Sequence, residues 1–447
     1  MAETAPDLAA PGPGARENPL TRSVAGVIGL GFLGAMLLVC LGSLFWTLSP
    51  APGAGGTARF NAGAPEAGRL PPWWGPKDEA DIRRLNALVA ADTLGAIAAE
   101  FDLEPEEAAQ ATGGPVADAL RDHWIYRGSR FRYLMGTDVL GRSLFYRTLT
   151  GGGISLTIGI AAALLSVTIG TLYGAISGYV GGLTDAVLMR IVDILFGLPY
   201  ILLVVLLAVA SDAAVRQYIS RSKPRNAWAE AQVQRLKAET GLTDELLSEP
   251  PAPDTALVAE LEALWRGDEP LPEGQAVRAI LDAAALQRIA PRSISEGRRM
   301  LIDVVILLAA IGGVSWLTVA RVIRGQVLSL KNQPFLEAAR AMGVSPVRQF
   351  VRHLLPNLLG PIIVYATLTA PLAILQESFL SFLGIGVKPP LPSWGNLAAD
   401  GLVELNPYKS HWWLLLFPCL MLGSTLLALN FVGEGLREAL DPKRARR

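Results

Sequence analysis

The stretch E-A-A-R-A-M-G-V-S-P-V-R-Q-F-V-R-H-L-L-P-N, residues 337–357, decides how this chain is arranged. It is basic and amphipathic, and it lies between two strongly apolar segments, residues 302–320 and 358–375. From residue 321 to residue 353 the acid Glu337 is outnumbered by Arg321, Arg324, Lys331, Arg340, Arg348 and Arg352. A cationic loop between two membrane-spanning segments stays on the cytoplasmic side. The stretch therefore predicts a polytopic membrane protein with this loop inside the cell.

The same stretch predicts two short helices separated by a turn. Residues 335–342 follow a proline and are mostly strong helix formers, and Gly343 stands where a helix would stop. Ser345 and Pro346 supply an N-cap and a first-turn proline for a second helix, which we expect Pro356 to close. A basic loop of this kind can be a simple solvated connector. Any more specific role for it depends on the spacing of its residues.

That spacing resembles the cytoplasmic coupling loop of the permeases of bacterial binding-protein-dependent ABC importers. The shared features are E-A-A from residue 337, a glycine six residues after the glutamate, and L-P-N with the proline thirteen residues after that glycine. In the family this loop sits in a groove of a separate ATPase. The resemblance implies charged contacts from Glu337 and Arg340, close docking at the alanines and a sharp turn at the glycine. The implied coupling residues are Glu337, Ala338, Ala339, Arg340, Gly343, Leu355 and Pro356.

The composition agrees with a membrane protein. Hydrophobic residues make up 51% of the 447 residues, and they are pooled in runs of about 20 rather than spread at amphipathic spacing. The formal net charge of −1 gives no sign of nucleic-acid binding. Cys40 and Cys419 lie in apolar runs and the chain has three His, so we expect neither a disulfide framework nor a metal site.

We expect an all-α protein with six transmembrane helices and two soluble extracytoplasmic insertions. The apolar run from residue 24 is about 25 residues long, which favours a retained anchor over the alternative of a cleaved signal peptide. The expected parts are a disordered cytoplasmic tail (1–23), the first transmembrane helix (24–49), an extracytoplasmic linker and insertion with short helices in 77–110 (50–134), an interfacial helix plus transmembrane helices two and three (135–210), a helical extracytoplasmic insertion (211–300), transmembrane helices four to six with the coupling loop 323–357 (301–434), and a cytoplasmic tail (435–447).

Two arguments about sidedness agree. The C-terminal tail carries Lys443, Arg444, Arg446 and Arg447, so it should be cytoplasmic. Six spans then place the N-terminus inside as well, and the loop between spans four and five also falls inside, as its charge demands. Both insertions fall outside.

A second motif precedes the second span, in M-G-T-D-V-L-G-R-S-L-F-Y-R from residue 135. Thr137 and Asp138 can cap a short amphipathic helix lying on the membrane surface. The string and the residues after it also resemble the G-T-D-x-x-G-R-D-x-x-S-R-x-x-x-G-x-R-x-S-L signature of the dipeptide and oligopeptide permease subfamily, which implies roles for Gly136, Asp138, Gly141 and Arg142. The chain departs from that signature at Ser143, Tyr146 and Gly153.

Several residues inside the spans predict local features of helix packing, pairing and function. Glycines at positions 170, 174 and 178 share one helix face and permit close helix packing. Arg190 and Asp193 can pair with each other, and Gly197 with Pro199 should bend the third span. Glu377, in a segment similar to the subfamily's E-x-x-L-S-F-L-G, is either a pathway or gate residue or a buried structural hydrogen-bonder.

The chain contains no G-x-x-x-x-G-K-[ST] phosphate loop, so an energy source must come from another protein. The resemblance implies a permease subunit of an ATP-driven importer for peptides or related small solutes in the bacterial inner membrane. It further implies a second permease subunit as heterodimer partner, two ABC ATPases that hold ATP and Mg²⁺, and an extracytoplasmic solute-binding protein. This chain itself would need no cofactor. The alternatives are an ion-coupled secondary transporter, for which Glu377 is the lone relay candidate, and a membrane-anchored scaffold built around the insertions.

Overall fold

A computed structural model describes residues 24–53, 55–127, 130–217 and 296–440, together with Ala231 and Gln234. The chain divides into two compact units, one of residues 1–205 with 307–447 and the other of residues 206–306. The expected N-terminal tail, residues 441–447 of the expected C-terminal tail and most of the second insertion lie outside the described residues, whereas residues 435–440 continue the last helix. The elements are α1 (Val24–Thr47), η2 (Pro65–Ala67), α2 (Glu79–Ala87), α3 (Ala91–Glu100), α4 (Pro105–Gln110), α5 (Gly114–Arg121), α6 (Leu144–Val180), α7 (Gly182–Phe196), α11 (Glu296–Lys331), α12 (Pro334–Ala341), α13 (Pro346–Gln349), η3 (Phe350–Leu354), α14 (Leu355–Phe382), α15 (Trp394–Val403) and α16 (Trp413–Leu440).

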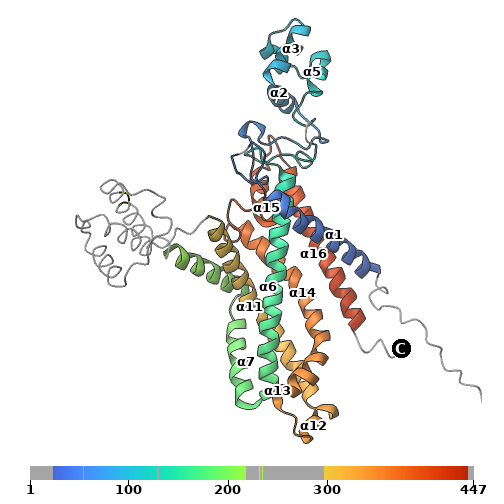
Figure 1. Cartoon of the computed structure of the whole chain (residues 1–447), viewed down its shortest axis with the longest axis vertical. Helices are drawn as coiled ribbons and strands as arrows, with labels where there is room; N and C mark the ends of the chain where they lie inside the picture. The colour runs from blue at the N-terminus through green and yellow to red at the C-terminus, as the bar shows by residue number, and fades with distance from the viewer. Residues whose placement is uncertain are drawn as a thin grey trace, which may run out of the picture. The chain divides into compact units, whose positions relative to one another are not determined.

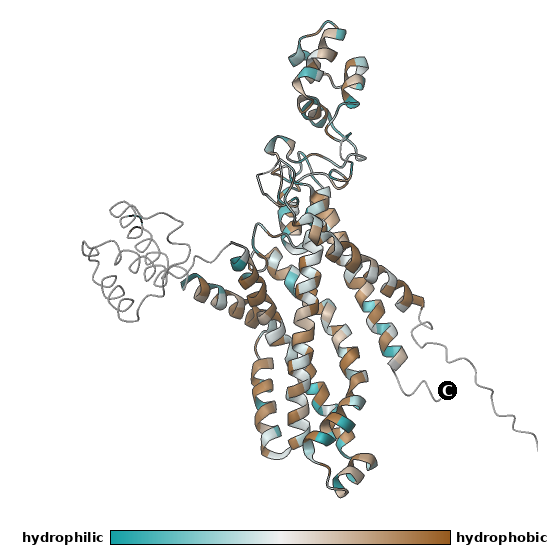
Figure 2. Cartoon of the chain, in the orientation of Figure 1, coloured by the Kyte–Doolittle hydropathy of each residue, from teal (hydrophilic) through white to brown (hydrophobic). Residues whose placement is uncertain are grey.

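Among the described residues, 6 helices are long and apolar enough to cross a membrane. Figure 2 shows the hydrophobic residues that run along them. The helices are Val24–Thr47, Leu144–Val180, Tyr200–Gln217, Gly297–Lys331, Pro346–Phe382 and Trp413–Ala439. The predicted all-helical protein with six spans is therefore confirmed.

The third span differs from the prediction. The helix expected to bend near Gly197 instead ends there, because α7 stops at Phe196 and a new helix begins at Tyr200. Pro199 cannot continue the hydrogen bonding of α7 and is suited to the first turn of the next helix. With 15 residues α7 is short for a membrane span, and Tyr200–Gln217 is the segment here that is long and apolar enough to cross the membrane.

Helix α6 is the centre of the first unit, where it packs against α14 and α1 (Figure 1). Its expected glycine face lies against α11. An added Cβ would lie 2.6 Å from Val319 Cβ at Gly170 and 3.0 Å from the carbonyl oxygen of Arg324 at Gly178. Only glycine permits this separation, so the backbones of α6 and α11 approach closely as the spacing predicted.

Helices α2 to α5 build a small module, residues 65–135, with its own core around Leu70, Leu85 and Leu120. Asp78 begins α2 in a capping box with Asp81. Lys409, from the loop before α16, binds the same pair, with its Nζ 2.7 Å from Asp81 Oδ1 and 3.0 Å from Asp78 Oδ2. Short helices were predicted in this region, and the structure adds α5 beyond them.

Helix α15 was not predicted. Its residues follow a proline-rich segment, and Ser393 begins the helix in a capping box with Asn396. The Trp394 ring is fully buried, and its Nε1 donates to the carbonyl oxygen of Thr148 on α6 (3.1 Å). The capping signal was present in the sequence, but a helix of 10 residues is too short to give a span-like apolar run.

Candidate functional site

The basic stretch forms a helix, a turn and a second helix, as predicted. Helix α12 ends at Ala341, and Gly343 follows in the left-handed region with φ 74°. The Val344 N–H donates to the carbonyl of Ala339 (3.1 Å) and the Gly343 N–H to that of Arg340 (2.9 Å). This double pattern satisfies two of the free carbonyls at the end of a helix, and it requires a residue that tolerates positive φ.

The implied coupling residues divide into an outer and an inner face of α12. Glu337, Ala338 and Arg340 are exposed, whereas Ala339 is 1% exposed and packs inside the chain. Close docking by both alanines was expected, but only Ala338 is available to an outside partner. Helical spacing explains this division, because residue 339 shares the inner face with the fully buried Leu336.

The expectation that Pro356 closes the second helix is wrong. Residues 350–354 form one π turn, in which the Leu355 N–H bonds to the carbonyl of Phe350, and the chain continues directly into α14. Pro356 is an early residue of α14, where its missing N–H does no harm. The loop is thus joined to the fifth span by a helix with a local irregularity, a feature often found at functional sites.

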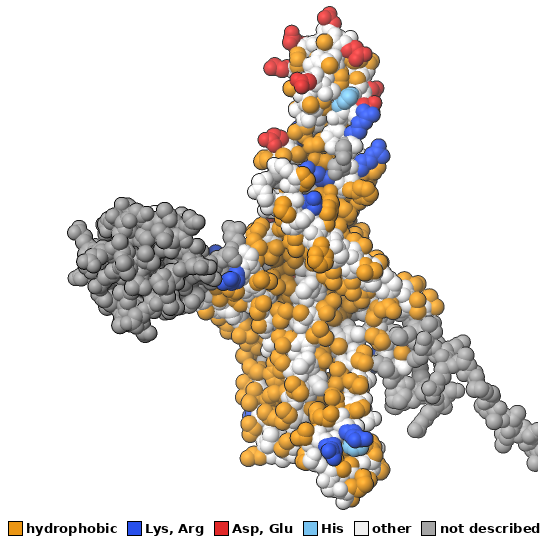
Figure 3. Space-filling model, in the orientation of Figure 1, with side chains coloured by type: hydrophobic (Ala, Val, Ile, Leu, Met, Phe, Trp, Pro, Cys, Tyr) orange, Lys and Arg blue, Asp and Glu red, His pale blue; other side chains and the backbone are white. Residues whose placement is uncertain are grey.

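The outer surface of the loop combines apolar and cationic side chains. Met342, Val347 and Val351 are 75%, 74% and 55% exposed. The arginines at positions 340, 348 and 352 form no ion pair with any described residue, unlike Arg324, whose Nε hydrogen-bonds Asp185 (2.5 Å). Figure 3 shows the basic side chains gathered at this end of the first unit. Exposed apolar residues among unpaired charges are typical of a surface that binds another protein.

Hydrogen bonds attach the loop to the end of α6. The Tyr179 hydroxyl donates to Gln349 Oε1 (2.9 Å), and Gln349 Nε2 donates to the carbonyl of Val344 (2.6 Å). Lys331 Nζ, at the end of α11, donates to the carbonyl of Tyr179 (2.7 Å). A displacement of α13 would therefore be transmitted to two membrane-spanning helices, α6 and α11. Spacing along the chain could not have identified Gln349, because its partner lies 170 positions away.

The second predicted site, residues 136–142, is a tight loop instead of an interfacial helix. Thr137 and Ser143 form an antiparallel bridge, and α6 begins only at Leu144 with Ser143 as its N-cap. Gly136 and Gly141 have φ of 78° and 72°, which a helix cannot accommodate. The surface helix was predicted from capping residues and amphipathic spacing. The positive φ angles of these two glycines are incompatible with it.

Asp138 organises this loop. Its Oδ1 accepts from the N–H groups of Leu140 (3.0 Å) and Arg142 (2.9 Å), and its Oδ2 accepts from Arg142 Nε (2.7 Å). Nη1 of Arg147, on the first turns of α6, lies 3.2 Å from the same Oδ2. Arg147 is 4% exposed, and its Nη2 lies 3.9 Å from Asp400 Oδ2 on α15. Arg147 stands at the second arginine of the subfamily signature, whereas no motif in the sequence pointed to Asp400. Together the two residues complete the charge balance around Asp138.

Two departures from the subfamily signature also find a structural explanation. Ser143 caps α6 and donates its hydroxyl to the carbonyl of Arg132 (2.5 Å). Gly153 faces α1, where an added Cβ would lie 2.9 Å from Leu44 Cδ2 and 3.0 Å from the carbonyl oxygen of Cys40. A large side chain at position 153 would push α1 away from α6.

Glu377 is fully buried. Ser381 Oγ donates to Oε1 of this residue (2.7 Å) and Ser378 Oγ to Oε2 (3.3 Å), while Ser155 of α6 and Ser393 before α15 also hydrogen-bond it. Of the two interpretations left open, this geometry matches the buried structural hydrogen-bonder. The expected pairing of Arg190 with Asp193 is wrong, because Asp193 pairs with Arg321 of α11 (2.8 Å).

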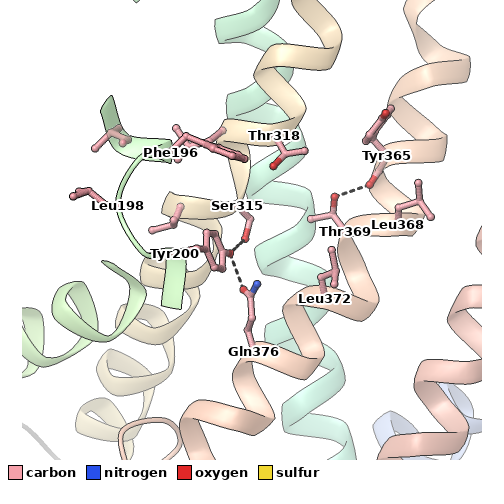
Figure 4. Close-up of a pocket in the computed structure, with 13 residues that line it drawn as sticks. Phe196, Leu198, Tyr200, Ser315, Thr318, Tyr365, Leu368, Thr369, Leu372 and Gln376 are labelled. Carbon is pink, nitrogen blue, oxygen red and sulfur yellow. Dashed lines mark hydrogen bonds between the residues drawn. The ribbon is translucent and has the colours of Figure 1, made fainter. Parts of the chain in front are cut away.

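A cavity of about 580 Å³ opens between the start of the Tyr200 helix, α11 and α14. Figure 4 shows polar side chains of all three elements at its wall. The Tyr200 hydroxyl lies 2.6 Å from Ser315 Oγ and donates to Gln376 Oε1 (2.8 Å). No sequence motif marks these residues, since they come together only in the folded bundle.

Six apolar helices, glycine-mediated helix packing and a protruding basic loop define a multi-pass membrane protein with a surface for a partner at one end. The chain matches the family described as "Binding-protein-dependent transport system inner membrane component" over residues 170–446. It belongs to this family, and the predicted type I importer permease fold is confirmed. The protein is accordingly a multi-pass component of the inner membrane.

Several proteins of known role are similar to it. It is 38% identical over 312 residues to the oligopeptide transport system permease protein OppC of Haemophilus influenzae, with 70% of each chain covered. It is 37% identical over 313 residues to OppC of Escherichia coli K12, which covers 70% of this chain and 72% of the relative. The dipeptide transport system permease protein DppC of Bacillus subtilis is 34% identical over 322 residues, covering 72% of this chain and 69% of the relative.

Proposed function

We infer that this chain is a pore-forming permease subunit of an ATP-driven importer for oligopeptides, dipeptides or related small solutes. Membership of the family and the transport roles of the similar proteins support this substrate class. The single observation that carries the mechanism is the exposed helix, glycine turn and helix between two membrane spans. Such a loop can receive motion from a separate protein, because its outer face is unoccupied by the described residues of its own chain.

The partners follow from what the chain lacks. Without a phosphate loop it cannot cradle ATP, so two ATPase subunits would hold ATP and Mg²⁺ and hydrolyse it. A second permease subunit would complete the pore, and an extracytoplasmic binding protein would deliver the solute. The loop and both termini would lie in the cytoplasm, and the α2–α5 module outside. The excess of basic residues in the loop and the C-terminal tail supports this orientation.

Coupling would run through three contacts. An ATPase that holds the outer face of α12 would move the loop when it binds ATP. The Tyr179–Gln349 hydrogen bond and the Lys331 contact would carry this displacement to α6 and α11. The π turn at residues 350–354 would carry it into α14, because a π turn can revert to regular helix with a small change in register.

The test is transport by the complex purified through a tag on this chain and reconstituted in vesicles. Glu337→Ala removes a charged contact of the outer face, and Gly343→Pro forbids the φ of 74° on which the turn depends. Both should abolish or strongly reduce ATP-dependent uptake while leaving the membrane helices folded. Glu79→Ala, an exposed glutamate in α2, is the matched control and should retain uptake.

Two outcomes would overturn the proposal. Full ATP-coupled uptake in both loop variants would show that the loop does not transmit the motion. Uptake that needs an ion gradient and no ATP, by a chain that purifies alone, would favour the secondary transporter instead.

A further inference from the structure

The cavity lies where the break between α7 and the Tyr200 helix faces the inner parts of α11 and α14. Ser315 and Thr318 are near the middle of α11, and Thr369 lies well inside the Pro346–Phe382 span, with Gln376 two turns further along the same helix. Polar side chains at this depth are costly when they face lipid, so their convergence on one cavity indicates a functional surface. Its volume of about 580 Å³ falls within the range of about 300–1,000 Å³ that is usual for ligand sites.

The hydrogen bonds at the wall orient one side chain for a ligand. The Tyr200 hydroxyl donates to Gln376 Oε1 (2.8 Å), and its oxygen lies 2.6 Å from Ser315 Oγ, whose hydroxyl donates to the carbonyl of Ile311 (2.8 Å). The carbonyl end of the Gln376 amide is thereby fixed. Its Nε2 has no hydrogen-bond partner among the described residues, and Figure 4 shows the nitrogen turned away from Tyr200. The wall thus presents an N–H donor whose orientation is set in advance.

The rest of the wall has a distinct chemical character. No described residue lining the cavity is Asp, Glu, Lys, Arg or His. The polar groups are hydroxyls and one amide, and apolar side chains such as Phe196, Leu368 and Leu372 surround them. A charged group entering this cavity would lose water without gaining a counter-charge from the described wall, whereas a neutral amide group could be hydrogen-bonded.

We propose that this cavity binds an uncharged, amide-bearing segment of the solute, with Gln376 Nε2 donating to a peptide carbonyl and the apolar wall contacting a neutral side chain. The inference rests on the proposed transport of peptides and adds a selectivity to it: neutral and aromatic residues pass this point more readily than charged ones. Gln376 is the specificity-determining residue, and Tyr200 is a positioning residue that acts through it.

The test compares three probe peptides, Ala-Phe-Ala, Ala-Lys-Ala and Ala-Glu-Ala, in vesicles that contain the complete purified complex. Gln376→Glu keeps an acceptor for Tyr200, removes the N–H donor and adds a negative charge. It should raise uptake of the lysine probe relative to the phenylalanine probe about tenfold and lower uptake of the glutamate probe. Gln376→Leu should reduce uptake of the phenylalanine probe by about two- to tenfold, the usual value of one hydrogen bond.

Comparing each variant with the unmodified complex cancels the preference of the delivering protein, because that protein is the same in every sample. Thr168→Val, on an exposed face of α6 away from the cavity, is the matched control and should change no probe ratio. Unaltered probe ratios in both Gln376 variants, with normal uptake by the unmodified complex, would overturn the inference and leave the proposed function standing. That result would mean that lipid or the neighbouring subunit fills the cavity.

A second measurement reports occupancy without depending on transport. Leu372 lines the cavity and is 58% exposed, so a Leu372→Cys variant can react with a maleimide after the exposed Cys419 is replaced by serine. The phenylalanine probe should slow labelling at position 372 but not at Leu164→Cys, a position 59% exposed on α6. Equal labelling with and without the probe would count against the site. If no probe is taken up by the unmodified complex, the proposed function fails, and protection at position 372 still decides whether the cavity binds peptide.

Discussion

The Asp138 carboxylate is the counter-charge of a buried arginine, and replacing it should be among the most damaging single changes at the head of α6. Asp138 is 7% exposed and Arg147 is 4% exposed, with Oδ2 and Nη1 separated by 3.2 Å. In Asp138→Asn the amide oxygen can still accept from the N–H groups of the loop, so the loop keeps its shape. The change therefore removes the charge and replaces the oxygen that accepts from Arg142 Nε with an N–H donor.

The expected loss of unfolding free energy depends on the negative charge that remains near Arg147. After the substitution the nearest carboxylate would be that of Asp400, whose Oδ2 lies 3.9 Å from Arg147 Nη2 and whose side chain is 68% exposed. Leaving one partner of a buried ion pair uncompensated costs about 3–5 kcal/mol. Since the Asp400 carboxylate supplies part of the missing charge, we expect Asp138→Asn to lower the free energy of unfolding by about 3 kcal/mol. Asp118→Asn breaks an exposed pair with Arg121 and should cost at most about 1 kcal/mol.

Unfolding by SDS titration in mixed micelles would measure this difference in free energy. The double variant Asp138→Asn with Arg147→Met removes both charges, so it should be more stable than Asp138→Asn alone, with a coupling energy of about 2 kcal/mol. A loss below about 1 kcal/mol in Asp138→Asn, or strictly additive effects in the double variant, would refute the assignment of Asp138 as the counter-charge.

Two further predictions concern α15 and its surroundings. Gly395→Ala would place a methyl group against the carbonyl oxygen of Ser378, so thermal unfolding should show a loss of stability of about 1–3 kcal/mol. Gly423→Ala, inside α16 with open space around it, should show no loss in the same assay. The hydrogen bond from Arg69 holds the pKa of the Glu404 carboxyl below its ordinary value of 4.5. A depressed folded pKa stabilises the protein above the unfolded pKa, and this contribution is lost as the pH falls through the folded value. Below about pH 4.5 the Tm of the native protein should therefore fall more steeply than that of Glu404→Gln, and parallel curves would argue against the pair.

Much of the loop between spans four and five could be predicted because its determinants are local. Pro334 starts a helix, and Gly343 ends it with a backbone angle that other residues rarely adopt. Charge and hydropathy then set the flanking spans. The division of α12 into an inner Ala339 and an outer Ala338 could have been foreseen only with knowledge of which helix face meets the bundle.

Local signals misled where long-range packing outweighs them. Thr137 and Asp138 have the chemistry of a helix start, yet Asp138 binds the backbone of its own loop, and the Thr137 hydroxyl donates to the carbonyl of Ala67 (2.6 Å). The loop is held by residues about 70 positions earlier in the chain. Arg190 and Asp193 likewise have the spacing of a pair, but Arg321 binds Asp193 from another helix.

Apolar runs of about 20 residues, glycine spacing and the distribution of basic side chains are properties of the chain itself, so the sequence alone determined six spans, the α-helical class and the family. The burial of Glu377 among serines, the charge balance of Arg147 and the cavity at Gln376 depend on residues of separate elements that come together in the folded chain. The positions of these residues along the chain do not indicate that they lie close together in space. Only the packed bundle decided them, because burial and hydrogen-bond partners are properties of neighbours in space.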